Sequence, residues 1–259
     1  ARFAGAEPAD GQGLFPPQAT VVLLVGVPGD VESEGNYRDQ LQSWLELATG
    51  SGQAARVFVL CDDPSAVTVA GTPDGKNVPK EAEVSTNHPP DSQSPVTNHA
   101  SRITRPPPPV TIQKGDRSTF LGLGQTLAGG TNALVVIAFG HGGRQGNTPV
   151  LHVRGPRIMA ADFKALARQA AAGESRWVMM FRGSGTFANE LVGERRQIIS
   201  SEGEMMFSDD PVGMPLLLKL AKEKPELPFS GLAEEFGRAT EAWYKDRNLA
   251  RTEDPTLWL

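Results

Sequence analysis

Runs of consecutive apolar residues that end in glycine-rich turns are the feature that most constrains how this chain can fold. The run at 133–139 leads into the motif GHGG (140–143), and the run at 177–181 leads into RGSG (182–185). A strand that is apolar throughout is typical of a sheet buried on both faces, and such sheets are usually parallel. Because α/β folds build their sites beyond the carboxyl ends of such strands, these two turns form the candidate site.

The rest of the chain alternates further apolar runs with segments of helical periodicity. Strands are expected at 20–27, 56–61, 133–139, 177–181 and 197–200, and helices at 37–48, 118–127, 159–172, 187–192, 214–221 and from Ser230 onward. We expect Ser118 and Ser230 to cap their helices, and a small hairpin or flap at 147–155. The order predicts a single α/β domain over 19–259, with three layers and a mostly parallel central sheet flanked by helices.

Two segments lack the periodicity of this core. Residues 1–18 are rich in Ala, Gly and Pro and are expected to form an extended N-terminal arm. Residues 62–117 form a long proline-rich insertion, in which Pro106 to Pro109 favour a polyproline II rod. His88 and His99 lie in the insertion, where two solvated loop histidines are a simpler interpretation than a metal site. We expect the arm and the insertion to contact other protein subunits.

The composition excludes several classes of partner. The net charge is −5 and the pI is about 5.5, so no basic field recruits nucleic acid. No apolar run approaches the roughly 20 residues that a transmembrane helix needs. Cys61 is the single cysteine, which excludes an internal disulfide, and its place at the end of an apolar run favours a buried hydrophobe over a catalytic thiol. A chain that begins with Ala fits removal of a signal peptide or trimming, and we expect an exported or periplasmic location rather than a cytoplasmic one.

Neither a cofactor motif nor a metal motif is recognisable. The segment GLGQTLAGG (122–130) fails the dinucleotide-binding fingerprint, because its spacing departs after Gly124 and it does not follow a strand directly. His152 is eleven residues from His141, a separation that matches no metal motif. We therefore expect no cofactor and no metal ion.

Several of these motifs resemble the legumain-type cysteine peptidases, which are relatives of the caspases. They are GHGG after an apolar strand, a later strand that ends in a Ser-Gly turn, and the C-terminal segment EEFGRATEAWYKDRNLARTEDPTLWL. The stretches VLHVRGPRIMAADFKALARQ and WVMMFRGSGTFANEL are similar to bacterial proteins described as legumain-like. The resemblance covers 20–259 apart from the proline-rich insertion, and it implies a caspase-like fold.

In that family a histidine turn and a cysteine after the next strand form a catalytic dyad, in which the thiolate attacks a peptide carbonyl. His141 matches the histidine, and Ser184 and Gly185 match the family's Ser-Gly. Arg182 stands where the cysteine would be. A guanidinium stays protonated and cannot form an acyl intermediate. The resemblance therefore implies a catalytically inactive pseudopeptidase that serves as a protein-binding or scaffold subunit.

Two alternatives stay open at this point. Ser184 can act as the nucleophile of a peptidase or esterase if His141 lies within hydrogen-bond reach, although a simpler role for its hydroxyl is to cap the following helix. Arg182 can bind a carboxylate, either of a small ligand in the vestigial cleft or from within the chain, and His141 can be a retained feature of the fold. The candidate binding residues are Gly140, His141, Gly142, Arg182, Gly183, Ser184 and Gly185.

Overall fold

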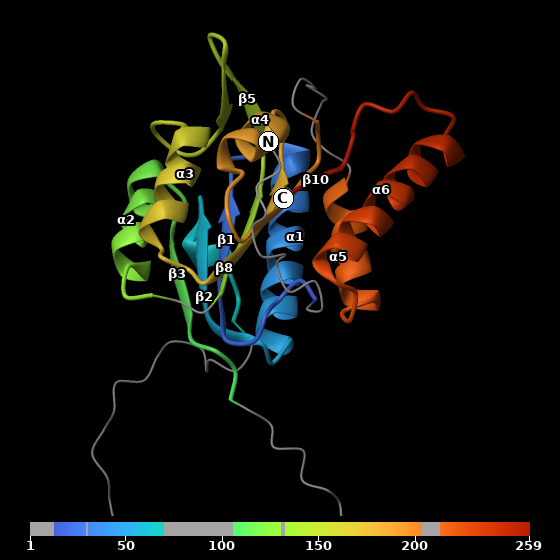
Figure 1. Cartoon of the computed structure of the whole chain (residues 1–259). Coiled ribbons are helices and arrows are strands. Elements are labelled where there is room, and N and C mark those ends of the chain that lie inside the picture. Colours follow the sequence, from blue (N-terminus) through green and yellow to red (C-terminus); the bar gives the residue numbers. More distant parts are fainter. Residues whose placement is uncertain (1–12, 30, 70–105, 131–132, 204–212) are drawn as a thin grey trace, which may run out of the picture.

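A seven-stranded sheet with the order β10-β9-β8-β4-β1-β2-β3 forms the centre of the molecule (Figure 1). The computed structural model describes residues 13–29, 31–69, 106–130, 133–203 and 213–259. The strands are β1 (Ala19–Val25), β2 (Ala54–Cys61), β3 (Val110–Lys114), β4 (Ala133–Phe139), β8 (Glu174–Met180), β9 (Arg196–Ser200) and β10 (Thr256–Trp258). Neighbouring strands are parallel except β9 and β10, which are antiparallel. The predicted mostly parallel sheet is therefore confirmed.

Helices cover both faces of this sheet. One face carries α1 (Val31–Gly50), α5 (Gly213–Glu223) and α6 (Phe229–Asp246), and the other carries α2 (Arg117–Leu127), α3 (Ala160–Gln169) and α4 (Ser184–Leu191). Figure 1 shows the two helical layers on either side of the strands. The predicted three-layer α/β architecture is confirmed.

Alternate residues of each central strand pack into two separate hydrophobic cores, one on each face of the sheet. In β1 all seven residues are buried, with Val21 and Leu23 facing α1, α5 and α6, and Val22 and Leu24 facing α2, α3 and α4. The second core holds a group of aromatic rings around Phe163, whose ring centroid lies 5.3 Å from that of Phe187 and 4.9 Å from that of Phe120. Burial on both faces explains why these strands are apolar at every position.

A small antiparallel sheet begins directly after His141. It contains β5 (Gly142–Gln145), β6 (Thr148–Leu151) and β7 (Ile158–Met159), in that order. The hairpin turn has Gly146 at φ +61°, a left-handed conformation that glycine adopts without strain. The flap was expected at 147–155, but its first strand begins at Gly142, so the GHGG turn itself continues into the hairpin.

The predicted 62–117 insertion is shorter than expected, because its described ends belong to the fold. Residues Pro64–Ala66 form a 3-10 helix, η1, and Val110–Lys114 form the edge strand β3, which pairs in parallel with β2. The centre of the insertion, 70–105, lies outside the described residues, and so do residues 1–12 of the predicted arm. Within the described part of the arm, Leu14 is buried in the core.

Helix starts are the main local corrections. Asp116, not Ser118, caps α2, because its Oδ1 accepts the backbone N–H of Thr119 at 2.8 Å. The cap position of α6 is Pro228, and Ser230 lies inside the helix. Each helix therefore starts one or more residues before the predicted cap.

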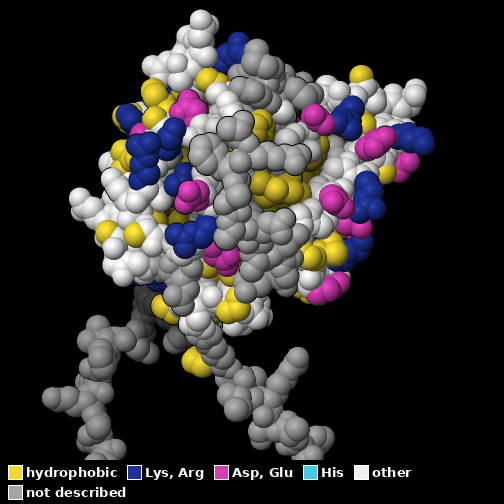
Figure 2. All heavy atoms as spheres, in the orientation of Figure 1, with side chains coloured by type: hydrophobic (Ala, Val, Ile, Leu, Met, Phe, Trp, Pro, Cys, Tyr) yellow, Lys and Arg dark blue, Asp and Glu magenta, His cyan; other side chains and the backbone are white. Residues whose placement is uncertain are grey.

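Charges of both signs are intermingled on the surface. Figure 2 shows Lys and Arg side chains alternating with Asp and Glu side chains along the edge formed by α5 and α6. Ion pairs on this edge include Lys219–Glu223 and Lys224–Glu235. Exposed pairs of this kind contribute little stability but keep the surface polar.

Candidate functional site

The two predicted turns lie at the carboxyl edge of the sheet, near the point where the strand order reverses. β1 pairs with β2 on one side and with β4 on the other. The chain builds outward from β1 to β2 and β3, then returns to place β4 on the opposite flank of β1. His141 follows β4, and Arg182 follows the next strand, β8. Crevices at such reversal points are the usual ligand sites of open α/β sheets.

Close backbone contact joins the turn after β1 to the turn after β4. A Cβ added to Gly140 would lie 2.7 Å from the Cα of Gly26, and Gly140 has φ +142°. The backbone N–H of Gly26 donates to the carbonyl of Phe139 at 2.8 Å. Only residues without side chains allow this approach, which explains the glycine before His141.

The imidazole of His141 lies close to Gly29 and beside the ring of a second histidine, His152. The ring of His152 is 5.1 Å from it, centroid to centroid, and the backbone N–H of His152 donates to the His141 carbonyl at 3.0 Å. A Cβ on Gly29 would lie 3.3 Å from Nδ1 of His141. Burial, followed by the charges of His141 and Arg157, lowers the pKa of His152, so this second imidazole resists protonation.

The Arg182 turn packs directly on the strand that follows His141. A Cβ added to Gly142 would lie 2.1 Å from the carbonyl oxygen and 2.7 Å from the backbone nitrogen of Arg182. Gly183 has φ +84° and occupies the cap position of α4, where a side chain would strain the backbone. The two turns that contain the candidate residues are thus in contact, with Gly142 as the point where they meet.

Ser184 is enclosed rather than presented to the site. Its side chain is 0% exposed, and its hydroxyl shares a 3.0 Å hydrogen bond with the hydroxyl of Ser201. Ser184 is the first residue of α4 and Gly183 holds the cap position, so the predicted cap role of the Ser184 hydroxyl is wrong. Gly185 is equally enclosed, because a Cβ there would lie 2.1 Å from the carbonyl oxygen of Gly203.

Glu202 is a site residue that the sequence reasoning missed. This carboxylate is 0% exposed, and its Oε2 accepts the backbone N–H of Gly183 at 2.7 Å. The Glu202 carboxylate therefore stabilises the Arg182 turn by accepting a charge-assisted hydrogen bond from its backbone. The sequence holds a signal for it, because Glu202 is the second residue after β9, as His141 is the second residue after β4.

His152 is a second residue of the site that has no predicted role, and its position follows from the hairpin. β5 and β6 pair with Gly142 opposite Leu151, which puts the preceding and following residues, His141 and His152, side by side. The two-residue turn at 146–147 fixes that register, so a hairpin with this turn predicts that His141 and His152 are neighbours.

Cys61 lies on a different strand from both turns. It ends β2, is 5% exposed, and is a free thiol. Burial, together with the nearby Asp63 and Asp62 carboxylates, raises the pKa of Cys61 to about 11. A thiol with this pKa is almost wholly protonated at neutral pH and is a poor nucleophile.

Metal and membrane features can be assessed only for the part of the chain that the structure describes. Within it, no group of three or more His, Cys, Asp or Glu residues is placed to share a metal ion. Among the same residues, every helix is too short or too polar to cross a lipid bilayer.

Comparison with known proteins identifies the fold. No family model and no curated protein matches the sequence. The structure is similar to that of the Drosophila initiator caspase Dronc, with a TM-score of 0.51 and 8% sequence identity over 99% of this chain and 86% of that chain. The chain therefore has a caspase-like fold. The narrower resemblance to legumain-type peptidases stays a prediction.

Proposed function

We propose that this protein is a catalytically inactive pseudopeptidase of caspase-like fold that acts by binding another protein at the carboxyl edge of its sheet. The observation that carries the proposal is the contact between the two turns, which sets Arg182 beside Gly142, the first residue of the strand that follows His141. A cation that stays protonated thus occupies the place where the resemblance calls for a nucleophile.

The other candidate nucleophiles in this region support the inactive interpretation. Ser184 is buried and its hydroxyl is hydrogen-bonded to Ser201, so an attack on a substrate carbonyl would require the start of α4 to open. Cys61 ends a strand on the far side of β1 from Arg182, and its pKa of about 11 keeps it protonated. Neither residue offers the activated group that covalent catalysis needs.

Arg182 is suited to recognition. It is half-buried at the sheet edge, where a guanidinium keeps its charge but is partly shielded from water. Guanidinium groups bind carboxylates through two parallel hydrogen bonds, which gives both direction and affinity. We therefore expect the partner to present an acidic side chain or a C-terminal carboxylate to this edge.

The direct test compares wild-type protein with Arg182→Ala as baits for a partner from the native source, with Arg247→Ala as the matched control. Arg247 is an exposed arginine at the end of α6 whose guanidinium lies 4.2 Å from the Trp243 ring centroid. A partner retained by wild type and Arg247→Ala but lost with Arg182→Ala supports the proposal. Identical retention by all three baits contradicts it.

A second test addresses catalysis. Purified protein should hydrolyse neither peptide nor ester substrates, and a fluorophosphonate should not label Ser184, because its hydroxyl is enclosed. Labelling of Ser184 that disappears in His141→Ala would establish the hydrolase alternative and overturn the inactive assignment.

Installing a thiol at the arginine position tests whether the two turns retain the geometry of a dyad. In Arg182→Cys, an imidazole close to the new thiol should lower its pKa, so it should be alkylated at neutral pH far faster than Cys61. The advantage should vanish in Arg182→Cys/His141→Asn. Equal alkylation rates in the two variants would show that His141 does not act on that position.

A further inference from the structure

A cavity of about 180 Å³ opens at the carboxyl ends of β1 and β2. β2 lies on the opposite side of β1 from β4 and β8, the strands that precede the His141 and Arg182 turns. It lies between β2, η1 and α1. Its lining includes Tyr37, Leu41, Cys61, Asp62, Asp63 and Val67. Its size is below the roughly 300 Å³ at which sites for whole small-molecule ligands begin, and it suits one long side chain.

The inner wall of the cavity is apolar and contains an enclosed thiol. Leu41 and Cys61 are 4% and 5% exposed, and Val67 packs against the same core. The Cys61 thiol makes no hydrogen bond with any described residue. The ring of Tyr37 stands edge-on to Phe139 at 6.0 Å and presents a further aromatic surface to the cavity. A hydrocarbon chain would find contacts on all of these sides.

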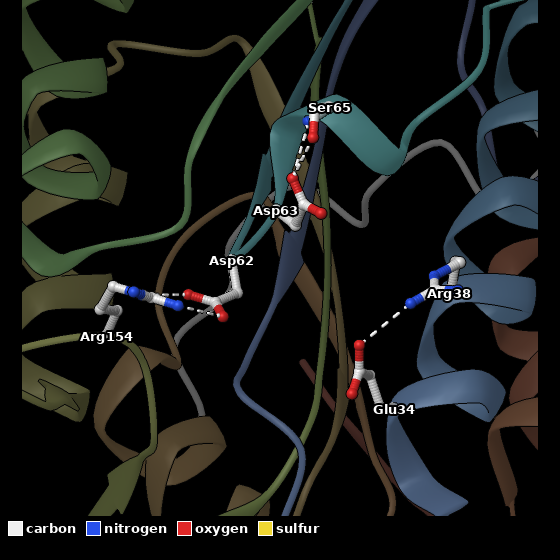
Figure 3. A network of polar contacts seen from close by, with 6 residues as sticks. All are labelled: Glu34, Arg38, Asp62, Asp63, Ser65 and Arg154. Atoms are coloured by element: carbon white, nitrogen blue, oxygen red, sulfur yellow. Dashed lines mark hydrogen bonds and ion pairs between the residues drawn. The ribbon is translucent and has the colours of Figure 1, made fainter. Parts of the chain in front are cut away.

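The mouth of the cavity carries three carboxylates, those of Glu34, Asp62 and Asp63. Figure 3 shows the arrangement: Asp62 is engaged by Arg154, at 2.5 and 2.8 Å, and Glu34 by Arg38, at 3.0 Å. Asp63 forms no ion pair at hydrogen-bond distance with the described residues, and the charges of Arg38 and Arg154 act on it from farther away. Its Oδ1 takes both hydrogen bonds from Ser65, and this donation is the main reason that the pKa of Asp63 is lowered. The second oxygen, Oδ2, forms no hydrogen bond with the described residues.

We propose that this cavity receives a single lysine or arginine side chain from a partner protein. The methylene stem lies against Leu41, Val67 and the Tyr37 ring, and the cationic head reaches Oδ2 of Asp63 at the mouth. Long basic side chains bury their stems in this way while their charge stays near water. An apolar slot that ends in an exposed carboxylate outside any close ion pair distinguishes such a side chain from an aliphatic one by charge and from a short amine by length.

The assignment does not depend on the state of the Arg182 turn. The cavity is lined from α1, η1 and the ends of β1 and β2, whereas Arg182 follows β8. Arg182→Ala should leave binding in the cavity unchanged, so failure of one proposal is distinguishable from failure of the other.

The test uses the full chain and capped pentapeptides that differ only in the central residue: lysine, arginine, norleucine or glutamate. Binding is followed by NMR through the backbone amides of Ala66 and Val67, which line the cavity. Lysine and arginine peptides should shift these amides saturably and bind about 2- to 5-fold more tightly than the norleucine peptide, because an exposed ion pair adds a modest gain. The glutamate peptide should not bind.

Two variants separate the roles of charge and space. Asp63→Asn should remove the preference for lysine over norleucine, and the fold should persist because Asn also caps a helix well. Cys61→Met fills the cavity from within and should weaken every peptide. Asp246→Asn, an exposed residue at the end of α6, is the charge-matched control and should bind like wild type.

Several results would overturn the proposal. Equal binding of lysine and norleucine peptides would reduce the cavity to an apolar pocket, and no saturable shift with any peptide would remove the site. Binding of free lysine amide as tightly as the pentapeptide would assign the cavity to a small amine instead of a protein. Peptide binding that appears only after the basic residues of 70–105 are changed to Gln would assign it to this chain's own segment.

Discussion

Substitution of Gly142 by alanine tests the contact on which the candidate site depends. The added methyl would lie 2.1 Å from the carbonyl oxygen of Arg182, and real Cβ contacts essentially never fall below 3.0 Å. The two turns would therefore have to separate by about 0.9 Å. Because the three nearest atoms all belong to the Arg182 backbone, no side-chain rotation relieves the contact.

The expected cost follows from two opposing effects. Overpacking of a closely packed site costs about 1–3 kcal/mol, and a backbone clash belongs at the upper end. Replacing glycine also restricts the unfolded chain, which returns about 0.4–1 kcal/mol. We therefore expect Gly142→Ala to lower the free energy of unfolding by about 2 kcal/mol and the Tm by roughly 4–8 °C.

Urea denaturation and calorimetry provide the assay, with Gly122→Ala as the control. Gly122 lies in α2, is exposed, and has open space around its missing side chain. Alanine there should stabilise the protein by about 0.5–1 kcal/mol, since it favours the helix. If Gly142→Ala is as stable as wild type while Gly122→Ala behaves as expected, the turns do not touch and the argument for the site fails.

Three further predictions concern the surroundings of the site. Glu202→Ala should cost about 1–3 kcal/mol, because it leaves the buried N–H of Gly183 without its acceptor; unchanged stability in urea would contradict that role. In an NMR titration, His152 should have a pKa below the ordinary histidine value of about 6.5. The unfolded state then binds a proton at higher pH than the folded state, so the stability that neutral His152 contributes should be present above pH 6.5 and lost as the pH falls. A His152 midpoint above 6.5 would contradict this prediction. Trp258→Phe should cost about 1 kcal/mol by removing the indole hydrogen bond to the Ser200 hydroxyl, and calorimetry that shows no change would mean that this bond does not hold β10 in place.

The central strands could be predicted from the sequence because their signal is local and complete. Every residue of β1 and β4 is buried, so each appears as an uninterrupted apolar run, and the glycines that follow mark the turns. The edge strand β3 escaped prediction for the opposite reason. Val110–Lys114 is largely exposed and follows four prolines, and it is a strand only because β2 offers it a partner.

The site was only partly predictable for a similar reason. His141 and Arg182 stand out because each follows an apolar run, and the turns that carry them are indeed in contact. The enclosure of Ser184 could not be read locally: its hydroxyl looks like a helix cap in the sequence, but Ser201, which follows another strand, supplies the partner that decides its role. Local rules describe what a residue can do, and tertiary neighbours choose among those possibilities.

The pair of glycines at the ends of β1 and β4 has a consequence for strand alignment. Because β1 and β4 are apolar along their whole length, sliding one strand along the other by two residues would still bury only hydrocarbon, and polarity would not oppose it. Gly26 and Gly140 oppose it, since a shifted strand would bring a side chain into a gap that admits only backbone. These glycines therefore fix the register of β1 against β4 by steric exclusion. The position of His141 relative to the other strands thus depends on the absence of a side chain at two positions.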